Sequence, residues 1–368
     1  MAKIITVASG KGGVGKTSIS LNLSLALADA GYRVCLFDAD LGLANVNILT
    51  GIYPEHGLAD VMDGKKSLSQ IMIREFNGID IIPGSSGVAR LADLDTAGAR
   101  RLLNGFENLT DYDFFILDTS AGISAQVLAF CRAAHEMILV ATPEPTSLTD
   151  AYALMKVLAK SPPLPRVRVI VNQVQSVPAA KKAWAKLKGT VHKYLSLTLS
   201  PLGILARDPN VPVAVASQIP FFTLFPDTRA SRCIRAMARK FSDNTDEGMP
   251  MDAFWDLCLG LLAGDRPDTR RSSSPEPDPK SSNNNSGLSA NQRAVLEDRL
   301  TEMEKDIARL LDGMNEIKTL LQEEAPHPRE AQKPNPGRRK SDRKPPDQNT
   351  IVPITLDFEA WIAEKNRA

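Results

Sequence analysis

The first part of the chain alternates between short apolar runs and longer segments with helical spacing. The runs are continuous and do not alternate with polar positions, which is typical of parallel strands covered on both faces by helices. We therefore predict an α/β fold with a doubly wound, mostly parallel sheet. Strands are expected at Lys3–Ala8, Arg33–Phe37, Asp80–Ile82, Phe114–Leu117, Met137–Ala141 and Val167–Val171. Helices are expected at Lys16–Ala30, Thr149–Ala159, Ala179–Leu187, Ala230–Phe241 and Met251–Leu262.

The pattern changes after residue 264, where we place the end of the first domain. Residues 265–289 are rich in Pro, Ser, Asp and Asn and predict a disordered linker. Residues 290–324 then carry apolar residues alternately four and three apart, which predicts a coiled-coil helix; the alternative is a lone amphipathic helix docked on the first domain. The seam consists of Leu296, Leu300, Met303, Ile307, Leu310, Met314, Ile317 and Leu321. Residues 325–349 predict a disordered basic linker, and residues 350–368 a short apolar segment suited to docking.

Composition excludes some classes of protein. The 368 residues hold 44 Lys and Arg against 43 Asp and Glu, so a wholly basic nucleic-acid coat protein is not expected. The chain begins without an apolar signal region and has no apolar run long enough to span a membrane. We therefore expect a cytoplasmic protein, peripheral at the inner membrane or cell pole at most.

The cysteines and histidines do not have the spacing of a metal site. Cys35, Cys131, Cys233 and Cys258 are far apart, no CxxC pair occurs, and the four histidines form no spaced set. A structural zinc site or an iron–sulfur cluster is therefore not expected. Scattered buried thiols in a reducing compartment are the simpler interpretation.

The strongest chemical signal is a glycine-rich loop between the first strand and the first helix. Its residues are Gly10, Lys11, Gly12, Gly13, Val14, Gly15, Lys16 and Thr17, followed by Ser18, and they match G-x-x-x-x-G-K-T. Glycines let successive backbone N–H groups turn toward phosphate oxygens, and the helix start adds partial positive charge. Lys16 would reach the β- and γ-phosphates, and the Thr17 hydroxyl would bind Mg²⁺. The sequence thus predicts a site for the phosphate chain of a nucleotide and Mg²⁺.

Carboxylates follow two later strands. Asp38 and Asp40 come just after the second strand, and Asp118 ends the strand FFILD. Ligands in open α/β sheets bind at the carboxyl ends of the strands, so we expect these side chains near the phosphate loop. Asp118 suits a position near Mg²⁺. For Asp38 and Asp40 the competing interpretation is helix capping or a solvated turn.

Base recognition has a weaker signal. Asn172 follows the strand RVRVIV, and its carboxamide can both donate to and accept from adenine. A turn asparagine at a strand end is the alternative. Arg207, Asp208 and Pro209 are candidates for a loop over the base.

The segment KGGVGKT resembles the deviant Walker A motif of the MinD/ParA ATPases. That resemblance implies a slow ATP hydrolase activated by ATP-dependent homodimerisation, in which Lys11 crosses the interface to phosphates bound by the other subunit. A cation supplied in trans would neutralise transition-state charge. The resemblance also implies that Asp40 orients or activates the attacking water, that Asp38 holds a water on Mg²⁺, and that Asn172 contacts adenine.

Longer segments, among them DADLGLANVNILTGI, DTSAGIS and ATPEPTSLTDAYALMKVL, are similar to the FlhG (FleN) branch of this family, the flagellar number regulators. The resemblance covers residues 1 to about 262 and implies an ATPase switch that regulates flagellar number or placement. The partners it implies are an FlhF-type GTPase, a flagellar transcription regulator and switch-complex components. The DQA-like activator motif of that branch does not precede the first strand here, which removes the basis for expecting GTPase activation.

Two other functions remain open. One is a MinD/ParA-like positioning ATPase for another cargo or for cell division; the other is a nucleotide-bound adaptor acting through its coiled coil. Basic residues cluster only near Arg166 and near Lys181, and the cluster near Lys181 is more simply a solvated helix face, so no specific nucleic acid is expected.

A membrane contact is a further alternative. Phe254, Trp255, Cys258, Leu259, Leu261 and Leu262 share one helical face, and the related ATPases carry a membrane helix at about this place. The polar positions here are Asp252 and Asp256, which anionic lipids repel. We therefore expect this face to pack internally, with weak membrane association as the alternative.

Overall fold

A computed structural model describes residues 1–40, 45–84, 96–107, 109, 111–160, 162–242 and 248–264. The chain divides into two units, Met1–Ser273 and Ser274–Ala368. The predicted linkers, the heptad segment 290–324 and the apolar segment 350–368 lie outside the described residues.

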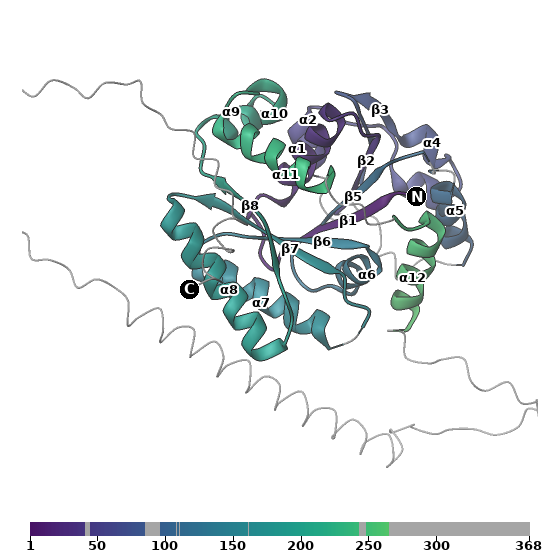
Figure 1. Ribbon diagram of the computed structural model, residues 1–368. Helices are drawn as coiled ribbons and strands as arrows, with labels where there is room; N and C mark the ends of the chain where they lie inside the picture. Colours follow the sequence, from purple (N-terminus) through teal and green to yellow (C-terminus); the bar gives the residue numbers. More distant parts are fainter. Residues whose placement is uncertain are drawn as a thin grey trace, which may run out of the picture. The chain divides into compact units, whose positions relative to one another are not determined.

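One eight-stranded sheet forms the centre of the first unit (Figure 1). Every neighbouring pair is parallel except β3 and β4, which form an antiparallel hairpin at one edge. In spatial order the strands are β3 (Ile73–Phe76), β4 (Ile79–Ile82), β2 (Val34–Ala39), β5 (Phe114–Thr119), β1 (Lys3–Ala8), β6 (Glu136–Ala141), β7 (Arg166–Val174) and β8 (Ser200–Ala206). This confirms the predicted α/β class.

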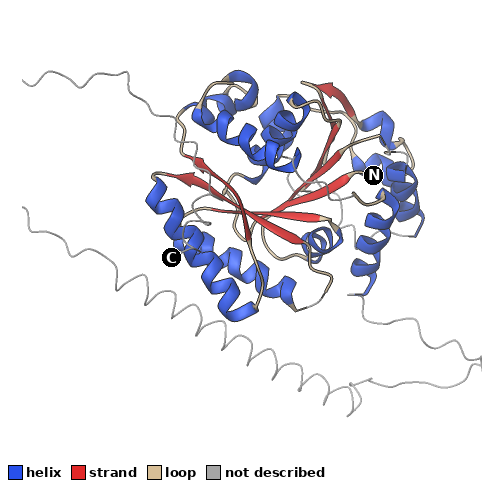
Figure 2. Ribbon diagram, viewed as in Figure 1, coloured by secondary structure: helices blue, strands red, loops and turns tan. Residues whose placement is uncertain are grey.

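Helices cover both faces of the sheet (Figure 2). The helices in the first half of the unit are α1 (Lys16–Asp29), α2 (Val46–Thr50), α3 (Leu58–Met62), α4 (Leu68–Ile71), α5 (Thr96–Glu107) and α6 (Ala125–Ala133). Those in the second half are α7 (Pro145–Ala159), α8 (Val177–Leu195), α9 (Asn210–Ala216), α10 (Phe221–Leu224), α11 (Arg229–Ser242) and α12 (Met251–Gly264).

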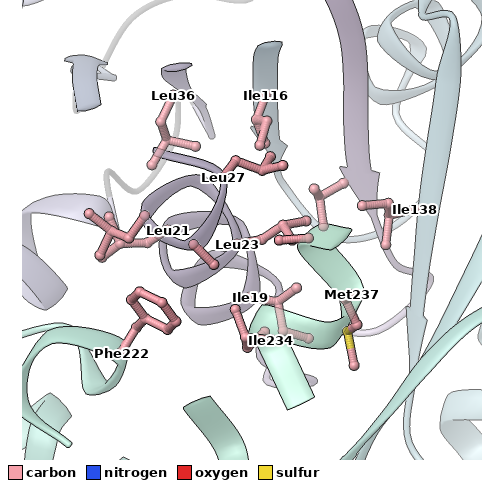
Figure 3. Packing of buried hydrophobic residues seen from close by; sticks show 14 of the residues in the cluster. Ile19, Leu21, Leu23, Leu27, Leu36, Ile116, Ile138, Phe222, Ile234 and Met237 are labelled. Carbon is pink, nitrogen blue, oxygen red and sulfur yellow. The ribbon is translucent and has the colours of Figure 1, made fainter. Parts of the chain in front are cut away.

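Two hydrophobic cores result because successive strand residues point to opposite faces. Ile5, Val7 and Ile116 pack with α1 and α11, whereas Ile4 and Phe115 pack with α5, α6 and α12. Figure 3 shows the first core, in which side chains of α1 lie between the sheet and side chains of α11. Helix α1, which opens at the phosphate loop, is buried almost all round and so is held firmly in place.

Two edge strands were not expected from the sequence. Strand β8 contains Pro201 and Gly203, which weaken a strand pattern but are tolerated at a sheet edge. Gly203 lets α11 approach the sheet closely, since an added Cβ would lie 2.5 Å from Met237 Cε and this side chain would have to move. Strand β3 reaches β4 through Asn77 and Gly78, both with positive φ, as a tight hairpin turn requires.

Helix α12 packs its apolar face inside the protein, as expected. The exposed fractions of Phe254 and Trp255 are 0% and 3%, and the Trp255 ring centroid lies 4.2 Å from that of Phe106 on α5. The face is therefore occupied by the protein's own core. None of the described helices is both long and apolar enough to cross a membrane.

Replacement of Trp255 by Ala should lower the free energy of unfolding by about 3–5 kcal/mol, because it opens a cavity among aromatic rings. Leu257→Ala, on the exposed side of the same helix, is the control and should cost about 1 kcal/mol or less. Urea unfolding of both variants measures the difference. Equal losses would mean that α12 does not use this face for packing.

Candidate nucleotide-binding site

The site lies where β1, β2 and β5 reach their carboxyl ends. In the sheet register, Asp118 pairs with Val7 on one side and with Asp38 on the other. The loop after β1 and the carboxylates of β2 and β5 are thereby brought to the same edge of the sheet. The structure thus brings together the phosphate loop and the carboxylates that the sequence predicted for one site.

Three glycines shape the phosphate loop. Gly13 and Gly15 have φ of 75° and 90°, a left-handed conformation that residues with a Cβ rarely adopt. Gly10 lies against α7: an added Cβ would be 2.1 Å from the backbone carbon of Asp150. No side chain fits there, so the loop and α7 are in direct backbone contact.

Lys16 and Asp118 form the buried charged centre of the site. Lys16 is 8% exposed, and burial lowers the pKa of its ammonium group, against the opposing effect of Asp118 and Asp40. Asp118 is fully buried and accepts a hydrogen bond from Ser20 Oγ at 2.9 Å, and the nearby Thr17 side chain acts to lower its pKa. Among the residues that the structure describes, Asp118 Oδ2 has no hydrogen-bond partner. A buried, unpartnered carboxylate oxygen beside a threonine hydroxyl suits Mg²⁺, which prefers oxygen ligands.

Asp38 has both the contacts of a helix cap and the burial of a metal-site carboxylate, the two interpretations that the sequence left open. Its carboxylate accepts from Val46 N at 3.2 Å and from Asp40 N at 3.3 Å, so it does cap the start of α2. It is also fully buried next to Asp118, as a metal-site carboxylate would be. Burial, and then the charge of Asp118, raises the pKa of Asp38 to about 8. Burial likewise raises the pKa of Asp118 to about 6.

Asp40 is less enclosed than its neighbour. Its side chain is half-buried and accepts a hydrogen bond from Asn45 Nδ2 at 3.2 Å. Residues 41–44, between these two side chains, lie outside the described part of the chain.

Lys11 does not point at its own phosphate loop. Its Nζ lies 2.9 Å from Glu144 Oε2 and 2.8 Å from Thr146 Oγ1, both at the start of α7. The Lys11 side chain is 38% exposed and that of Glu144 is 62% exposed, so the ion pair is weak and easily exchanged. Sequence reasoning missed these two partners, because more than 130 positions separate them from Lys11.

Asn172 contacts the phosphate loop directly. It is 7% exposed, and its Nδ2 donates to Val14 O at 2.7 Å. Its Oδ1 accepts from Gln173 N at 2.8 Å. One donor hydrogen and one lone pair remain free for a base. Asn172 is therefore not a simple turn residue.

The residues proposed to lie over the base have mixed roles. Arg207 N donates to Val174 O at 2.9 Å, which places this segment beside the end of β7 and near Asn172. The Asp208 carboxylate, however, accepts from Asn210 N at 3.0 Å and from Ala230 N at 3.2 Å. It stabilises the starts of α9 and α11, so its contacts are structural.

Comparisons with known proteins agree with this geometry. A family described as AAA domain matches residues 2–161. The antiactivator FleN of Pseudomonas aeruginosa is 41% identical over 239 residues, covering 65% of this chain and 85% of FleN. The flagellum site-determining protein YlxH of Helicobacter pylori is 35% identical, covering 55% and 69%. MinD of Bacillus subtilis is 30% identical, covering 72% and 96%.

A solved structure of MinD from Pyrococcus horikoshii with Mg-ADP matches with a TM-score of 0.55 and 26% identity over 66% of this chain and 97% of that one. The fold and the site define a P-loop ATPase that binds ATP with Mg²⁺ and hydrolyses it. The chain belongs to the MinD/ParA family, and its similarity to FleN and YlxH places it with the FlhG-like members.

The raised pKa values of Asp38 and Asp118 predict how stability depends on pH. Both carboxyls keep a proton in the folded state at a pH where the unfolded chain has lost it, because their unfolded pKa is near 3.8. Without Mg²⁺, the free energy of unfolding should therefore fall between about pH 4 and pH 8, by up to about 1.4 kcal/mol per pH unit for one group. Asp38→Asn should flatten this slope in urea titrations at pH 5, 6, 7 and 8.

The slope, and not the absolute stability, is the quantity to compare, because the Asp38→Asn variant also loses one backbone hydrogen bond. Asp256→Asn, on the exposed side of α12, is the control and should leave the slope unchanged. An equal slope for the wild type and Asp38→Asn would contradict the protonated state of Asp38.

Proposed function

We propose that this chain is an ATP-dependent dimerising switch that regulates flagellar number or placement. The observation that carries the proposal is the similarity to FleN and YlxH across the ATPase unit, together with a complete set of phosphate-site residues. The names of those relatives, an antiactivator and a flagellum site-determining protein, describe regulation of flagella.

We assign the residues of the site as follows. Gly10 to Ser18 bind the phosphates through backbone N–H groups, and the Lys16 ammonium neutralises phosphate charge. Thr17 and Asp118 bind Mg²⁺ directly, and Asp38 holds a water on the ion. Bound Mg²⁺ neutralises charge on the phosphate oxygens. Asp40 orients the attacking water, and its half-buried position suits a group that must meet water. Asn172 contacts adenine with its remaining donor and acceptor.

Lys11 provides the link to dimerisation. In the single chain it is held by Glu144 and Thr146 at the start of α7. We propose that ATP-dependent pairing exchanges these contacts for phosphates in the partner copy. A chain alone then lacks one cation at the reacting phosphate, which makes its hydrolysis slow. In this exchange α7 loses two contacts. We therefore expect partners that recognise the dimer to bind at the surface of α7.

Partners and location follow from the same similarity. We propose that the chain acts in the cytoplasm or at the cell pole, with a flagellar transcription regulator, an FlhF-type GTPase or a switch-complex component as its partner. The heptad segment 290–324 is proposed as a coiled coil that adds a second binding site. The packed face of α12 argues against membrane insertion by that helix.

The dimer mechanism predicts opposite effects for two variants. Lys11→Ala should remain monomeric with Mg-ATP and lose most hydrolysis, while still binding Mg-ADP, because its cation acts only in trans. Asp40→Ala should form stable dimers with Mg-ATP, because hydrolysis no longer separates them. Light scattering on the purified chain measures whether each variant is a monomer or a dimer. Lys65→Ala, an exposed lysine paired with Asp63, is the control and should behave as the wild type. A monomeric Asp40→Ala would overturn the mechanism.

The cellular role is tested in the source organism. Deletion of the gene should change the number or position of flagella counted by electron microscopy, and the wild-type gene should restore them. Lys16→Ala should fail to restore them, because the phosphate site no longer binds ATP. Normal flagella together with misplaced division septa would instead support a cell-division ATPase. Full restoration by Lys16→Ala would favour an adaptor that does not need ATP.

A further inference from the structure

Two successive residues of β7 reach the same loop. Asn172 Nδ2 donates to Val14 O at 2.7 Å, and Gln173 Nε2 donates to Gly13 O at 3.1 Å. Successive side chains of a regular strand point to opposite faces, so this arrangement needs a local change of the backbone. Gln173 supplies it with φ of 56°, and the pairing of β7 with β8 shifts register between Val171 and Val174.

The conformation of Gln173 is unfavourable in itself. A residue with a Cβ seldom has positive φ, and such residues persist where the surrounding structure requires them, often at functional sites. In this structure the reason for the positive φ of Gln173 is the local change of backbone direction, which turns the side chains of Asn172 and Gln173 toward the phosphate loop. Gly15 belongs to the same contact, since a Cβ added to it would lie 2.5 Å from Asn172 Nδ2. Asn172 and Gln173 thus hold the carbonyls of two successive loop residues, and Asn172 packs closely against a third, Gly15.

The consequence for the loop follows from the geometry of the peptide bond. In a planar trans peptide the C=O of one residue and the N–H of the next point in opposite directions. Hydrogen bonds that hold the Gly13 and Val14 carbonyls toward β7 therefore direct the N–H groups of Val14 and Gly15 away from β7. The phosphate loop uses these N–H groups as donors to phosphate.

We propose that Gln173 is a positioning residue for nucleotide binding, which holds the Gly13 peptide so that the Val14 N–H is already oriented for phosphate. It acts through the loop and touches no reacting atom. Its neighbour Asn172 contacts both the loop and, as proposed above, the base, so the pair connects base recognition to phosphate binding. The inference rests on residues 10–17 as the phosphate site, but not on dimerisation or on flagellar regulation.

The chain contains a matched control. Gln218, after α9, also has φ of 56° and also donates one side-chain hydrogen bond, to the Tyr53 hydroxyl at 2.7 Å. Replacing either glutamine by glycine relieves the same backbone conformation and removes one hydrogen bond. Of the two, Gln173 is the one that contacts the phosphate loop. A difference in nucleotide affinity between Gln173→Gly and Gln218→Gly therefore measures the effect of the contact between Gln173 and the phosphate loop.

The experiment measures the affinity of the full-length chain for Mg-ADP by calorimetry, together with the midpoint of thermal unfolding without nucleotide. Mg-ADP is chosen because its binding does not require the proposed dimer. Gln173→Gly should bind Mg-ADP about three- to tenfold more weakly than the wild type, the usual effect of one lost hydrogen bond. Its unfolding midpoint should match that of Gln218→Gly, and Gln218→Gly should keep wild-type affinity.

A second variant keeps the side-chain shape. Gln173→Glu replaces the donor by a carboxylate facing the Gly13 carbonyl, so it should also weaken Mg-ADP binding. Wild-type affinity in both Gln173 variants would overturn the proposal, as would equal losses in Gln173→Gly and Gln218→Gly. A wild-type chain that did not bind Mg-ADP would instead refute the phosphate site itself, so the two failures are distinguishable.

Discussion

The structure depends on holding two carboxyl groups and a lysine in a place with little water. Asp38, Asp118 and Lys16 are buried at one edge of a parallel sheet, where unpaired charges are costly. The sheet register places the two carboxylates on neighbouring strands, and burial raises the pKa of both. The protein keeps this arrangement because a divalent cation and a phosphate chain complete it. Local instability of the free site is thus the physical basis of its affinity for Mg-ATP.

The phosphate loop is connected to the rest of the protein by contacts that leave little freedom. Gly10 has no room for a side chain beside α7, and Asn172 and Gln173 hold the loop carbonyls from β7. Ser9 O also accepts from Gly122 N at 2.9 Å, which ties the loop to the segment after Asp118. The phosphate loop is thus in direct contact with α7, with β7 and with the segment after β5. This rigidity suits a protein that reports which nucleotide it holds.

Lys11 is held less firmly than the rest of the loop. Within the described part of the chain, its side chain contacts an exposed ion-pair partner and one hydroxyl, which together cost little to break. A strongly bound Lys11 would oppose transfer to another subunit, and an unbound one would lose entropy on docking. The weak contact with α7 therefore fits a residue that has to change partners, and it connects the proposed dimer to the helix that begins at Pro145.

The sequence by itself determined the fold class and the chemistry of the site. Continuous apolar strands predict a sheet buried on both faces, and a glycine-rich loop between a strand and a helix predicts phosphate binding. Both can be predicted from the sequence because both are local patterns. The tertiary structure alone decided the partners of these residues. The contacts of Lys11 with Glu144 and of Gln173 with Gly13 join residues far apart in the chain, and β8 depends on its place at the sheet edge. Such contacts are set by how the elements pack, and no local pattern of residues records them.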